Sequence, residues 1–357
     1  MRIAFVGVKR KYQELRPDYR DAFNRFHLEL PYYYAQDGGN QVLITTVDYQ
    51  DNACFFSPAV SDVGTGYGAL RCDTEENFKI KGSSYSDTRY DVVVHWRKWF
   101  PELYRPEAIN VINCQDHSFS DEWLDSVRNA RSEGKLYGIL CFPGWHKRNL
   151  IRELGARGSF PPDRLFDGVT LGVDTDVYRP LPGKDPYQML WASDPGRGVG
   201  AAFELAVRLF KINRKFKLHV CWPDYSSAVS VSHPALKFHR NLDNGPELWD
   251  LFGSTGILPY TSGFMEPSSR AHRQAMAAGS LVLYPPGMGT PSELIEDGVT
   301  GLVRPVEEWA GHIMQSIHDG TCQTLGRQAR EYAISENWAV QARRFNDLFG
   351  KMLEERK

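Results

Sequence analysis

The chain alternates short runs of β-branched and other apolar residues with longer segments of helical periodicity. Runs such as IAFVGV (3–8), YDVVVHW (90–96) and TGILPY (255–260) have the length and composition of buried strands. Segments such as GAAFELAVRLFKIN (200–213) place apolar residues at helical spacing. Strands that alternate with helices are typical of parallel sheets covered by crossover helices. The pattern therefore predicts an α/β fold built on doubly wound, Rossmann-like parallel sheets.

A proline-rich segment divides this alternation into two halves. RPLPGKDPY (179–187) contains three prolines and one glycine, a composition typical of a linker, and the strand–helix pattern restarts after it. A chain of 357 residues is comfortable as two domains. We expect an N-terminal domain over 1–178 and a C-terminal domain over 179–337. Because open parallel sheets bind ligands beyond the carboxyl ends of their strands, the two halves should face a central cleft.

Composition excludes several classes of function. The 42 basic and 44 acidic residues leave a formal net charge of −2, without the basic excess of a nucleic-acid-binding protein. The six cysteines have no CxxC spacing and suit a reducing compartment better than a disulfide framework or a zinc cluster. The N-terminus does not resemble a secretory signal, and no apolar run approaches the roughly 20 residues that span a bilayer. We expect a cytoplasmic protein, at most peripheral to the inner face of a membrane.

The stretch SGFMEPSSRAHRQAMAAGS (262–280) has a polar beginning and a run of small residues near its end. Pro267 suits the first position of a helix, the serines at 268–269 would fall in its first turn, and Gly279 would end it. Free backbone N–H groups and the helix dipole make such a helix start a binding site for anions. Taken alone, the stretch has an equally good alternative interpretation, a plain crossover helix whose Glu266 caps its own N-terminus.

The order of motifs from 255 onwards resembles the donor-binding core of GT-B glycosyltransferases, in particular the retaining family 4 enzymes. That family has a strand ending near a proline, a Glu, seven residues, a second Glu and Ala-Met-Ala-x-Gly. A Gly-rich turn, a Glu at a helix start and Glu-Asp-Gly-x-x-Gly-hydrophobic follow. The corresponding positions here are Glu266, Gln274, 275–279, 287–290, Glu293 and 296–302.

Two further segments agree with this resemblance. LGVDTDVYRP (171–180) is similar to the family's segment at the end of the first domain. WASDPGRGVGAAFELA (191–206) is similar to the strand, loop and helix that carry a basic residue, here Arg197, to the donor diphosphate. Leu171 replaces the Asn that is usual in the first of these segments. Two departures concern the donor site: Gln274 replaces the second Glu, and Trp191 stands where a second basic residue is usual.

The resemblance implies a retaining, metal-independent hexosyltransferase without a cofactor. Its donor would be a UDP-, GDP- or other nucleotide-diphosphate sugar, and its acceptor a hydroxyl of a glycan, a lipid-linked glycan or a small molecule. Synthesis of a cell-surface polysaccharide or glycoconjugate is the expected context. The N-terminal domain would bind the acceptor, and a last helix over 338–357 would cross back to it. The departures at 191 and 274 suggest one alternative, a non-catalytic nucleotide-sugar-binding subunit. A second alternative is another GT-B enzyme, a nucleotide-sugar epimerase or hydrolase.

The resemblance also implies roles for individual residues. Three are candidate catalytic residues: Glu266 at the donor sugar, Arg197 at the diphosphate and His117 at the domain edge near the sugar. The expected donor-binding residues are Ser193, Gly198, Pro267, Ser268, Ser269, Arg270, Gln274 and Glu293. His95 and Asp116 are expected on the acceptor side. Two of these residues have structural alternatives to a role in donor binding. Arg197 could be a solvent-exposed arginine at a helix start, and Glu293 could be a first-turn carboxylate that complements the helix dipole.

A set of basic residues between 128 and 157 has two interpretations. Its members are Arg128, Arg131, Lys135, Lys147, Arg148, Arg152 and Arg157. Such residues can form a patch for anionic lipid headgroups, as in peripheral enzymes that glycosylate lipid-linked acceptors. Solvated helix faces balanced by nearby acids are the interpretation we favour.

Overall fold

The structure, a computed structural model, describes residues 1–7, 41–46, 54–56, 89–156, 160–167, 169–193, 195–222, 231–240, 242 and 245–356. These residues form two compact units: unit 1 is Met1–Leu171 with Trp338–Lys357, and unit 2 is Gly172–Asn337. The division comes earlier in the chain than the predicted boundary at 178. Val173 and Tyr178 are buried in a hydrophobic cluster of unit 2, which explains why 172–178 belongs there.

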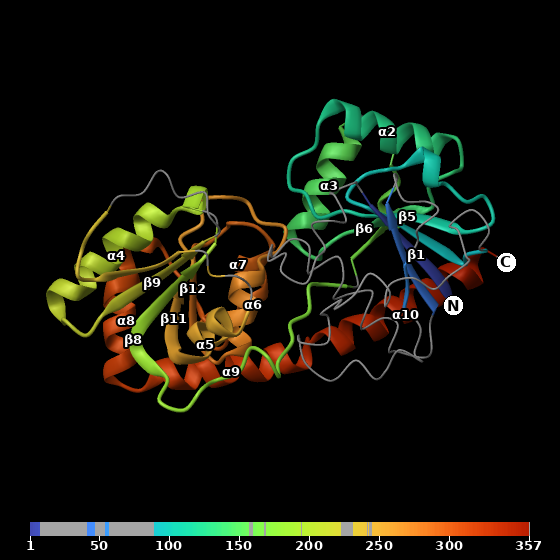
Figure 1. Cartoon of the computed structure of the whole chain (residues 1–357). Coiled ribbons are helices and arrows are strands. Elements are labelled where there is room, and N and C mark those ends of the chain that lie inside the picture. The colour runs from blue at the N-terminus through green and yellow to red at the C-terminus, as the bar shows by residue number, and fades with distance from the viewer. Residues whose placement is uncertain are drawn as a thin grey trace. The chain divides into compact units, whose positions relative to one another are not determined.

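A mainly parallel sheet lies at the centre of unit 1, with the described strands in the order β3-β2-β1-β4-β5-β6-β7 (Figure 1). The strands are β1 (Arg2–Gly7), β2 (Gln41–Thr46), β3 (Cys54–Phe56), β4 (Val92–Trp96), β5 (Ile109–Asn113), β6 (Gly138–Leu140) and β7 (Leu165–Phe166). Neighbouring strands are parallel except β2 and β3, which are antiparallel. All residues of β4 and β5 are buried, as expected for central strands covered on both faces.

Helices cover both faces of this sheet. On one face, α2 (Asp121–Ser132) and α3 (Trp145–Gly155) pack Leu124, Val127 and Leu150 against Ile112 and Ile139. On the other face, the apolar side of α10 (Trp338–Glu355) packs against alternate residues of β1, β4 and β5. The C-terminal helix is therefore part of the core of unit 1, although the rest of that core comes from the first half of the chain.

Unit 2 is built on a parallel sheet in the order β10-β9-β8-β11-β12-β13. Its strands are β8 (Asp185–Ala192), β9 (Lys217–Trp222), β10 (Leu236–Arg240), β11 (Thr255–Pro259), β12 (Leu281–Tyr284) and β13 (Leu302–Val303). The helices are α4 (Val199–Ile212), α5 (Pro246–Ser254), α6 (Arg270–Ala277), α7 (Thr290–Leu294), α8 (Trp309–His318) and α9 (Thr321–Ser335). One hydrophobic cluster joins α4 and α8 to the sheet, and another joins α5 and α6 to its opposite face. Unit 2 is doubly wound, as predicted.

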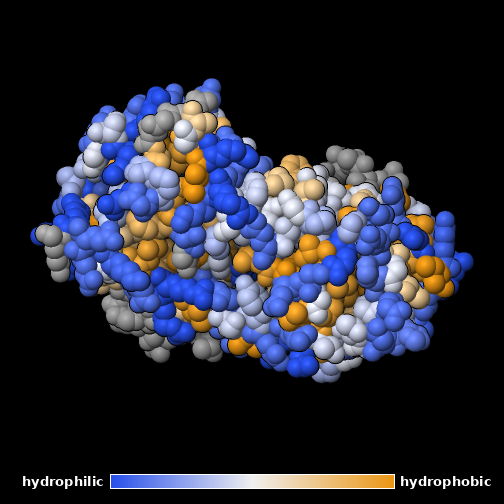
Figure 2. Space-filling view, turned by 180° about the vertical axis from the view of Figure 1, so that it is seen from behind, coloured by the Kyte–Doolittle hydropathy of each residue, from blue (hydrophilic) through white to orange (hydrophobic). Residues whose placement is uncertain are grey.

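The distribution of hydrophobic residues on the surface is that of an ordinary globular protein, in keeping with the 42% hydrophobic residues of the sequence. On the face seen in Figure 2, hydrophilic residues predominate and hydrophobic residues form scattered patches. Among the described helices, none combines the length and the apolar character needed to cross a bilayer.

Candidate functional site

The loops that follow β8 and β11 meet because these strands are neighbours in the sheet of unit 2. After β8, the chain forms a short 3-10 helix, Pro195–Arg197, and enters α4 through Gly198. A Cβ atom added to Gly198 would lie 2.2 Å from the carbonyl oxygen of Thr261 in the loop after β11. The hydroxyl of Thr261 also donates to the carbonyl of Gly198 at 2.7 Å. This close approach requires glycine and holds the two loops together.

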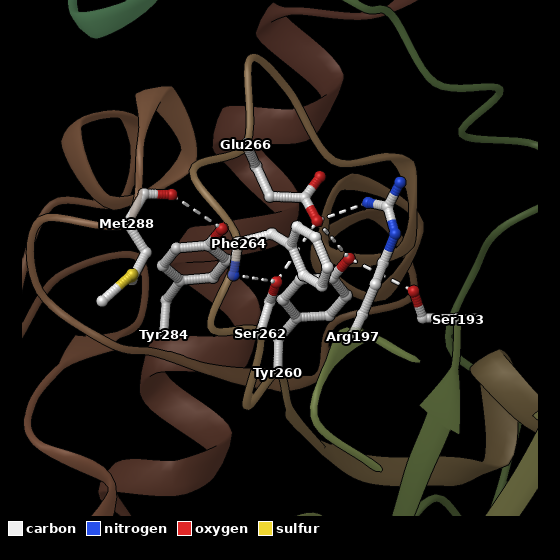
Figure 3. Close-up of polar contacts among 8 residues, drawn as sticks. All are labelled: Ser193, Arg197, Tyr260, Ser262, Phe264, Glu266, Tyr284 and Met288. Carbon is white, nitrogen blue, oxygen red and sulfur yellow. Dashed lines mark hydrogen bonds and ion pairs between the residues drawn. The ribbon is translucent and has the colours of Figure 1, made fainter. Parts of the chain in front are cut away.

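Glu266 is the centre of the contacts between these loops (Figure 3). Its side chain is 3% exposed, and its Oε1 atom forms an ion pair with Nη1 of Arg197. Oε1 also accepts hydrogen bonds from Tyr260 Oη at 3.1 Å and from Ser262 Oγ at 3.3 Å. Because the Tyr260 hydroxyl donates to Glu266, its oxygen can accept from Ser193 Oγ, 3.3 Å away. Residues from two strand ends thus fix one oxygen of the carboxylate.

The second oxygen of this carboxylate is placed differently. No hydrogen bond between described residues involves Oε2 of Glu266, and in Figure 3 this atom points away from the three donors. A carboxylate oxygen without a protein donor is an acceptor for a ligand hydroxyl. The arrangement can therefore bind a hydroxylated ligand at Oε2, while Oε1 holds the side chain in place.

Arg197 is the accessible member of the pair. Its side chain is 43% exposed, whereas that of Glu266 is 3% exposed. Burial alone would lower the pKa of Arg197, but the charge of Glu266 and the contact with Tyr260 more than offset this and raise it. Burial, and then the charge of Glu266, raise the pKa of the Tyr260 phenol. The guanidinium is therefore a permanent cation at the edge of the site, where it can bind an anionic ligand such as phosphate.

The backbone of Glu266 is fixed by the turn that follows β12. The Glu266 N–H donates to the carbonyl of Met288 at 3.2 Å, and the Thr290 N–H donates to the carbonyl of Glu266 at 2.9 Å. Tyr284 Oη donates to the same Met288 carbonyl at 3.1 Å. Gly289, at φ 92°, lies so close that an added Cβ would be 2.2 Å from the carbonyl oxygen of Glu266. The loop after β11 is thus held by both of its neighbours.

A layer of aromatic rings lies beside the carboxylate. Tyr260 stacks on Trp191 and on Tyr284, with ring centroids 5.7 and 5.5 Å apart. His272 of α6 packs its ring edge-on against both tyrosines. Burial lowers the pKa of His272 to about 3, so this imidazole is neutral near pH 7. Trp191, the residue at the expected second basic position, is 1% exposed and belongs to this layer, so it supplies no charge to the site.

The structure corrects the predicted start of the helix after Glu266. Helix α6 begins at Arg270 with Ser269 as its N-cap, so Pro267 and Ser268 precede the helix instead of forming its first turn. Glu266 pairs with Gly289 in an isolated bridge immediately before these residues, and the chain bends at Pro267. The predicted end is confirmed. Gly279, at φ 72°, closes the helix with hydrogen bonds from its own N–H to Met276 and from Ser280 N–H to Ala275, both 2.9 Å.

The remaining donor-side residues lie at different places in unit 2. Gln274 is on α6, and its Nε2 donates to Tyr178 Oη at 2.8 Å. Glu293 is an exposed first-turn residue of α7. Ser193, Arg197, Gly198 and Glu266 are brought together, as described above. Sequence reasoning missed Tyr260, although it ends a predicted strand beside Glu266.

In unit 1, His95 does not have the expected accessible position. Its ring is fully buried, its Nε2 contacts Asn110 Oδ1 at 3.2 Å, and its Nδ1 accepts from Phe100 N–H at 3.3 Å. Burial lowers its pKa to about 3. Both ring nitrogens are thus satisfied inside the core, and neither is exposed to a ligand.

Asp116 and His117 do lie on the surface of unit 1, at the carboxyl end of β5. Asp116 pairs with Arg97, a residue that sequence reasoning missed, and His117 is exposed. Helix α3 holds the backbone of both residues: His146 Nε2 donates to the Asp116 carbonyl and Asn149 Nδ2 to the His117 carbonyl, each at 2.9 Å.

Four of the basic residues on α2, α3 and their flanks have acidic partners among the described residues. The ion pairs are Arg128–Asp125, Lys135–Glu133, Lys147–Asp167 and Arg152–Glu153. Arg157 lies outside the described residues. These pairs agree with solvated helix faces balanced by nearby acids.

The chain was compared with known families, curated proteins and solved structures. No family model and no curated protein matches it. A glycosyltransferase from Rickettsia africae ESF-5 is 14% identical, with a TM-score of 0.67 over 98% of both chains. Sucrose-phosphate synthase from Thermosynechococcus elongatus is 14% identical, with a TM-score of 0.66 over 99% of this chain and 100% of that one. Anabaena HepE in complex with UDP and glucose is 13% identical, with a TM-score of 0.65 over 98% of this chain and 100% of that one.

Identities this low show the fold alone. The likeness extends over almost the whole length of each chain and includes both α/β units. The two units, each built on a mainly parallel sheet with helices on both faces, have the architecture that the resemblance predicts. The chain therefore has the GT-B fold.

Proposed function

We propose that the protein is a retaining glycosyltransferase that moves a hexose-type sugar from a nucleotide-diphosphate sugar to an acceptor hydroxyl. The observation that carries the proposal is the Glu266 carboxylate, with Oε1 held by Arg197, Tyr260 and Ser262 and Oε2 left for a ligand. A buried carboxylate beside an accessible guanidinium matches a ligand that carries hydroxyls at one end and phosphates at the other. Anabaena HepE, which has the same fold, has been solved with UDP-glucose.

In the proposed reaction, the bond between the sugar C1 and the diphosphate oxygen breaks, and the acceptor oxygen bonds to C1 on the same face. The acceptor proton passes to the leaving phosphate. Negative charge grows on the diphosphate as the bond breaks, so a fixed cation and helix N-termini near it lower the barrier. We assign the cation to Arg197 and the helix starts to α4 and α6, which begin at Val199 and Arg270.

The proposed chemistry requires no metal ion and no cofactor. Trp191 is buried at the position where a second basic residue is usual, so Arg197 is the one cation that we assign to the diphosphate. The helix N-termini must then stabilise more of the negative charge on the diphosphate than they would beside two basic residues. Glycans, lipid-linked glycans and small hydroxylated molecules are the proposed acceptors, in polysaccharide or glycoconjugate synthesis. We place the enzyme in the cytoplasm, with peripheral membrane contact if its acceptor is lipid-linked.

The test has two stages. A thermal-shift screen against UDP, GDP, ADP and dTDP identifies the base, because a ligand that binds only the folded state raises the Tm. The corresponding nucleotide sugars are then assayed for turnover with and without EDTA, using wild type, Arg197→Ala and the control Arg327→Ala. Arg327 is also ion-paired in unit 2, but it is exposed on α9.

We expect Arg197→Ala to lower turnover about 10²- to 10³-fold, the usual effect of losing one donor to developing negative charge. EDTA and Arg327→Ala should have no effect, and NMR of the product should show the anomeric configuration of the donor. Nucleotide binding without turnover would favour a non-catalytic binding subunit, whereas epimerised or hydrolysed sugar alone would favour an epimerase or hydrolase. If no nucleotide binds and no nucleotide sugar is consumed, the proposal fails.

A further inference from the structure

Two histidines face each other on neighbouring strands at one edge of the sheet in unit 2. His219 is on β9, and His239 is on the edge strand β10. Their rings stack with centroids 5.1 Å apart and 16° between the ring planes, and His219 Nδ1 lies 2.9 Å from His239 Nε2. Both side chains lie on the sheet face opposite α4 and α8, because the neighbouring residues Leu218 and Phe238 pack into the cluster with those helices.

The contacts of Gln188 fix which nitrogen of each imidazole carries a proton. Gln188, on β8, donates through Nε2 to Asp185 Oδ2 at 3.2 Å and to the Lys215 carbonyl at 3.3 Å. Its Oε1 atom is therefore the one that faces His219 Nε2, 3.0 Å away. His219 must then donate from Nε2 and accept at Nδ1. The 2.9 Å contact is a hydrogen bond from the Nε2–H of His239 to the Nδ1 lone pair of His219.

This arrangement is that of histidines that bind a metal ion. In such sites one ring nitrogen binds the ion, and the other donates to a carbonyl or carboxylate oxygen that orients the ring. His219 already has the orienting contact, through Gln188, and its remaining lone pair points at His239. Two imidazole nitrogens on one tetrahedral zinc ion are about 3.3 Å apart, so widening the gap by about 0.4 Å would admit an ion in place of the shared proton.

We propose that His219 and His239 bind a divalent transition-metal ion such as Zn²⁺ or Ni²⁺, which links the edge strand β10 to β9. This inference is independent of the function proposed above. His219 is 9% exposed and His239 is half-buried, so an ion can reach the pair from the side of His239. On binding, His239 would lose its proton at Nε2 and take one up at Nδ1, which has no hydrogen bond to another described residue. The ring would thus stay neutral.

The pair would supply two ligands, and water would complete the coordination. No group of three or more His, Cys, Asp or Glu side chains in the described parts of the chain is placed to hold a metal ion. Imidazole is a good ligand for Zn²⁺, Ni²⁺ and Cu²⁺, whereas Mg²⁺ and Ca²⁺ prefer carboxylate, carbonyl and water oxygens. A site of two imidazoles should therefore discriminate strongly between these two groups of ions.

The charge state of the pair suits this role. Burial lowers the pKa of His219 to about 4. Burial and then the charge of Lys237 lower the pKa of His239, and Glu247 in the first turn of α5 partly offsets this. Both imidazoles are therefore neutral near pH 7, which is the form that binds a metal ion.

The test uses protein without a histidine tag, treated with EDTA and then dialysed free of the chelator. Calorimetric titrations and thermal shifts with Ni²⁺, Zn²⁺ and Mg²⁺ would be measured for wild type, His219→Gln, His239→Gln and Gln188→Leu. The matched control is His318→Gln, because His318 is an exposed histidine of the same unit, at the end of α8. Circular dichroism without added metal checks that each variant is folded.

We expect the wild type to bind one Ni²⁺ or Zn²⁺ ion and to gain roughly 5–10 °C in Tm at a free metal concentration 100-fold above its Kd. Mg²⁺ should not bind. His219→Gln and His239→Gln should each lose this gain in Tm. Gln188→Leu should weaken binding about 10- to 100-fold, the usual loss when a group that orients a metal-binding histidine is removed. His318→Gln should behave as wild type.

Three results would overturn the assignment. Wild-type affinity in the folded His219→Gln and His239→Gln variants would show that the ion binds elsewhere. Loss of binding in His318→Gln alone would place the ion at an ordinary surface histidine. A Tm that neither Ni²⁺ nor Zn²⁺ raises would show that the pair is only a structural hydrogen bond. None of these outcomes affects the proposed glycosyl transfer, which is measured by turnover of the nucleotide sugar.

Discussion

Replacing Gly289 with alanine tests whether the turn after β12 positions Glu266. Gly289 has φ 92° and ψ −164°, a backbone region that is essentially restricted to glycine. An added Cβ would lie 2.2 Å from the carbonyl oxygen of Glu266 and 2.6 Å from its nitrogen. Real Cβ atoms do not approach backbone atoms this closely, so either the turn or the Glu266 backbone must move.

The expected loss of stability has two parts. The unfavourable backbone conformation costs about 1–3 kcal/mol, and the steric overlap costs another 1–3 kcal/mol, roughly as much as overpacking a core. We therefore expect Gly289→Ala to lower the free energy of unfolding by about 2–6 kcal/mol. Gly287, in the same turn, is the matched control: it also has a positive φ of 72°, but an added Cβ would have no atom within 4 Å. Gly287→Ala should cost only about 1–2 kcal/mol.

Both variants would be measured by urea denaturation and by calorimetric titration with the nucleotide that stabilises the wild type. Displacing Glu266 should abolish or greatly weaken binding of the nucleotide sugar in Gly289→Ala, whereas Gly287→Ala should bind as wild type under conditions where both variants are folded. Equal losses of stability would refute the steric argument. Wild-type affinity in Gly289→Ala would refute the role of this turn in positioning Glu266.

Three further predictions test other parts of the structure. Tyr260→Phe keeps the stacked ring but removes one hydrogen bond to Glu266 Oε1. We expect the affinity for the nucleotide sugar to fall about tenfold in calorimetric titrations, with little change in Tm. Unchanged affinity would contradict the role assigned to this contact. Burial lowers the pKa of His219 from its usual 6.5 to about 4, so the unfolded state takes up its proton first and the folded state loses stability as the pH falls from 6.5 towards 4. The loss should reach about 1–3 kcal/mol, and urea denaturation of His219→Gln across this range should show a shallower dependence on pH than wild type. Arg330 donates to the carbonyls of Thr175, Tyr178 and Ala277. Arg330→Met should therefore lower the free energy of unfolding by about 2 kcal/mol in urea denaturation. Wild-type stability would show that these hydrogen bonds do not fix segment 172–178 against the rest of unit 2.

Several features of this protein follow from local sequence patterns. The apolar runs at 3–8, 90–96 and 255–260 contain most of β1, β4 and β11, and the helical pattern at 200–213 contains most of α4. Gly279 ends α6 as its position after the small residues predicts. These predictions succeed because strand alternation, helix period and the preference of a helix end for glycine involve only residues close together in the chain. The doubly wound α/β class follows from the order of these elements.

Tertiary structure alone decides which of these residues meet. The pairing of β8 with β11 brings Arg197 to Glu266 and places Tyr260 between Ser193 and the carboxylate. Strand order also decides the position of His95, which is buried in the core because β4 is a central strand.

Arg97, the partner of Asp116, has a φ of 66°. It could not be singled out from sequence, because arginine has no preference for a positive φ and only the contacts of the turn at 96–98 impose one. The start of a helix can also depend on contacts between distant segments. Glu266 pairs with Gly289, and α6 begins only at Arg270, after Pro267 and Ser268. Local patterns thus determined the elements of this protein, whereas its sites depend on strand order and burial, which arise only when distant segments pack together.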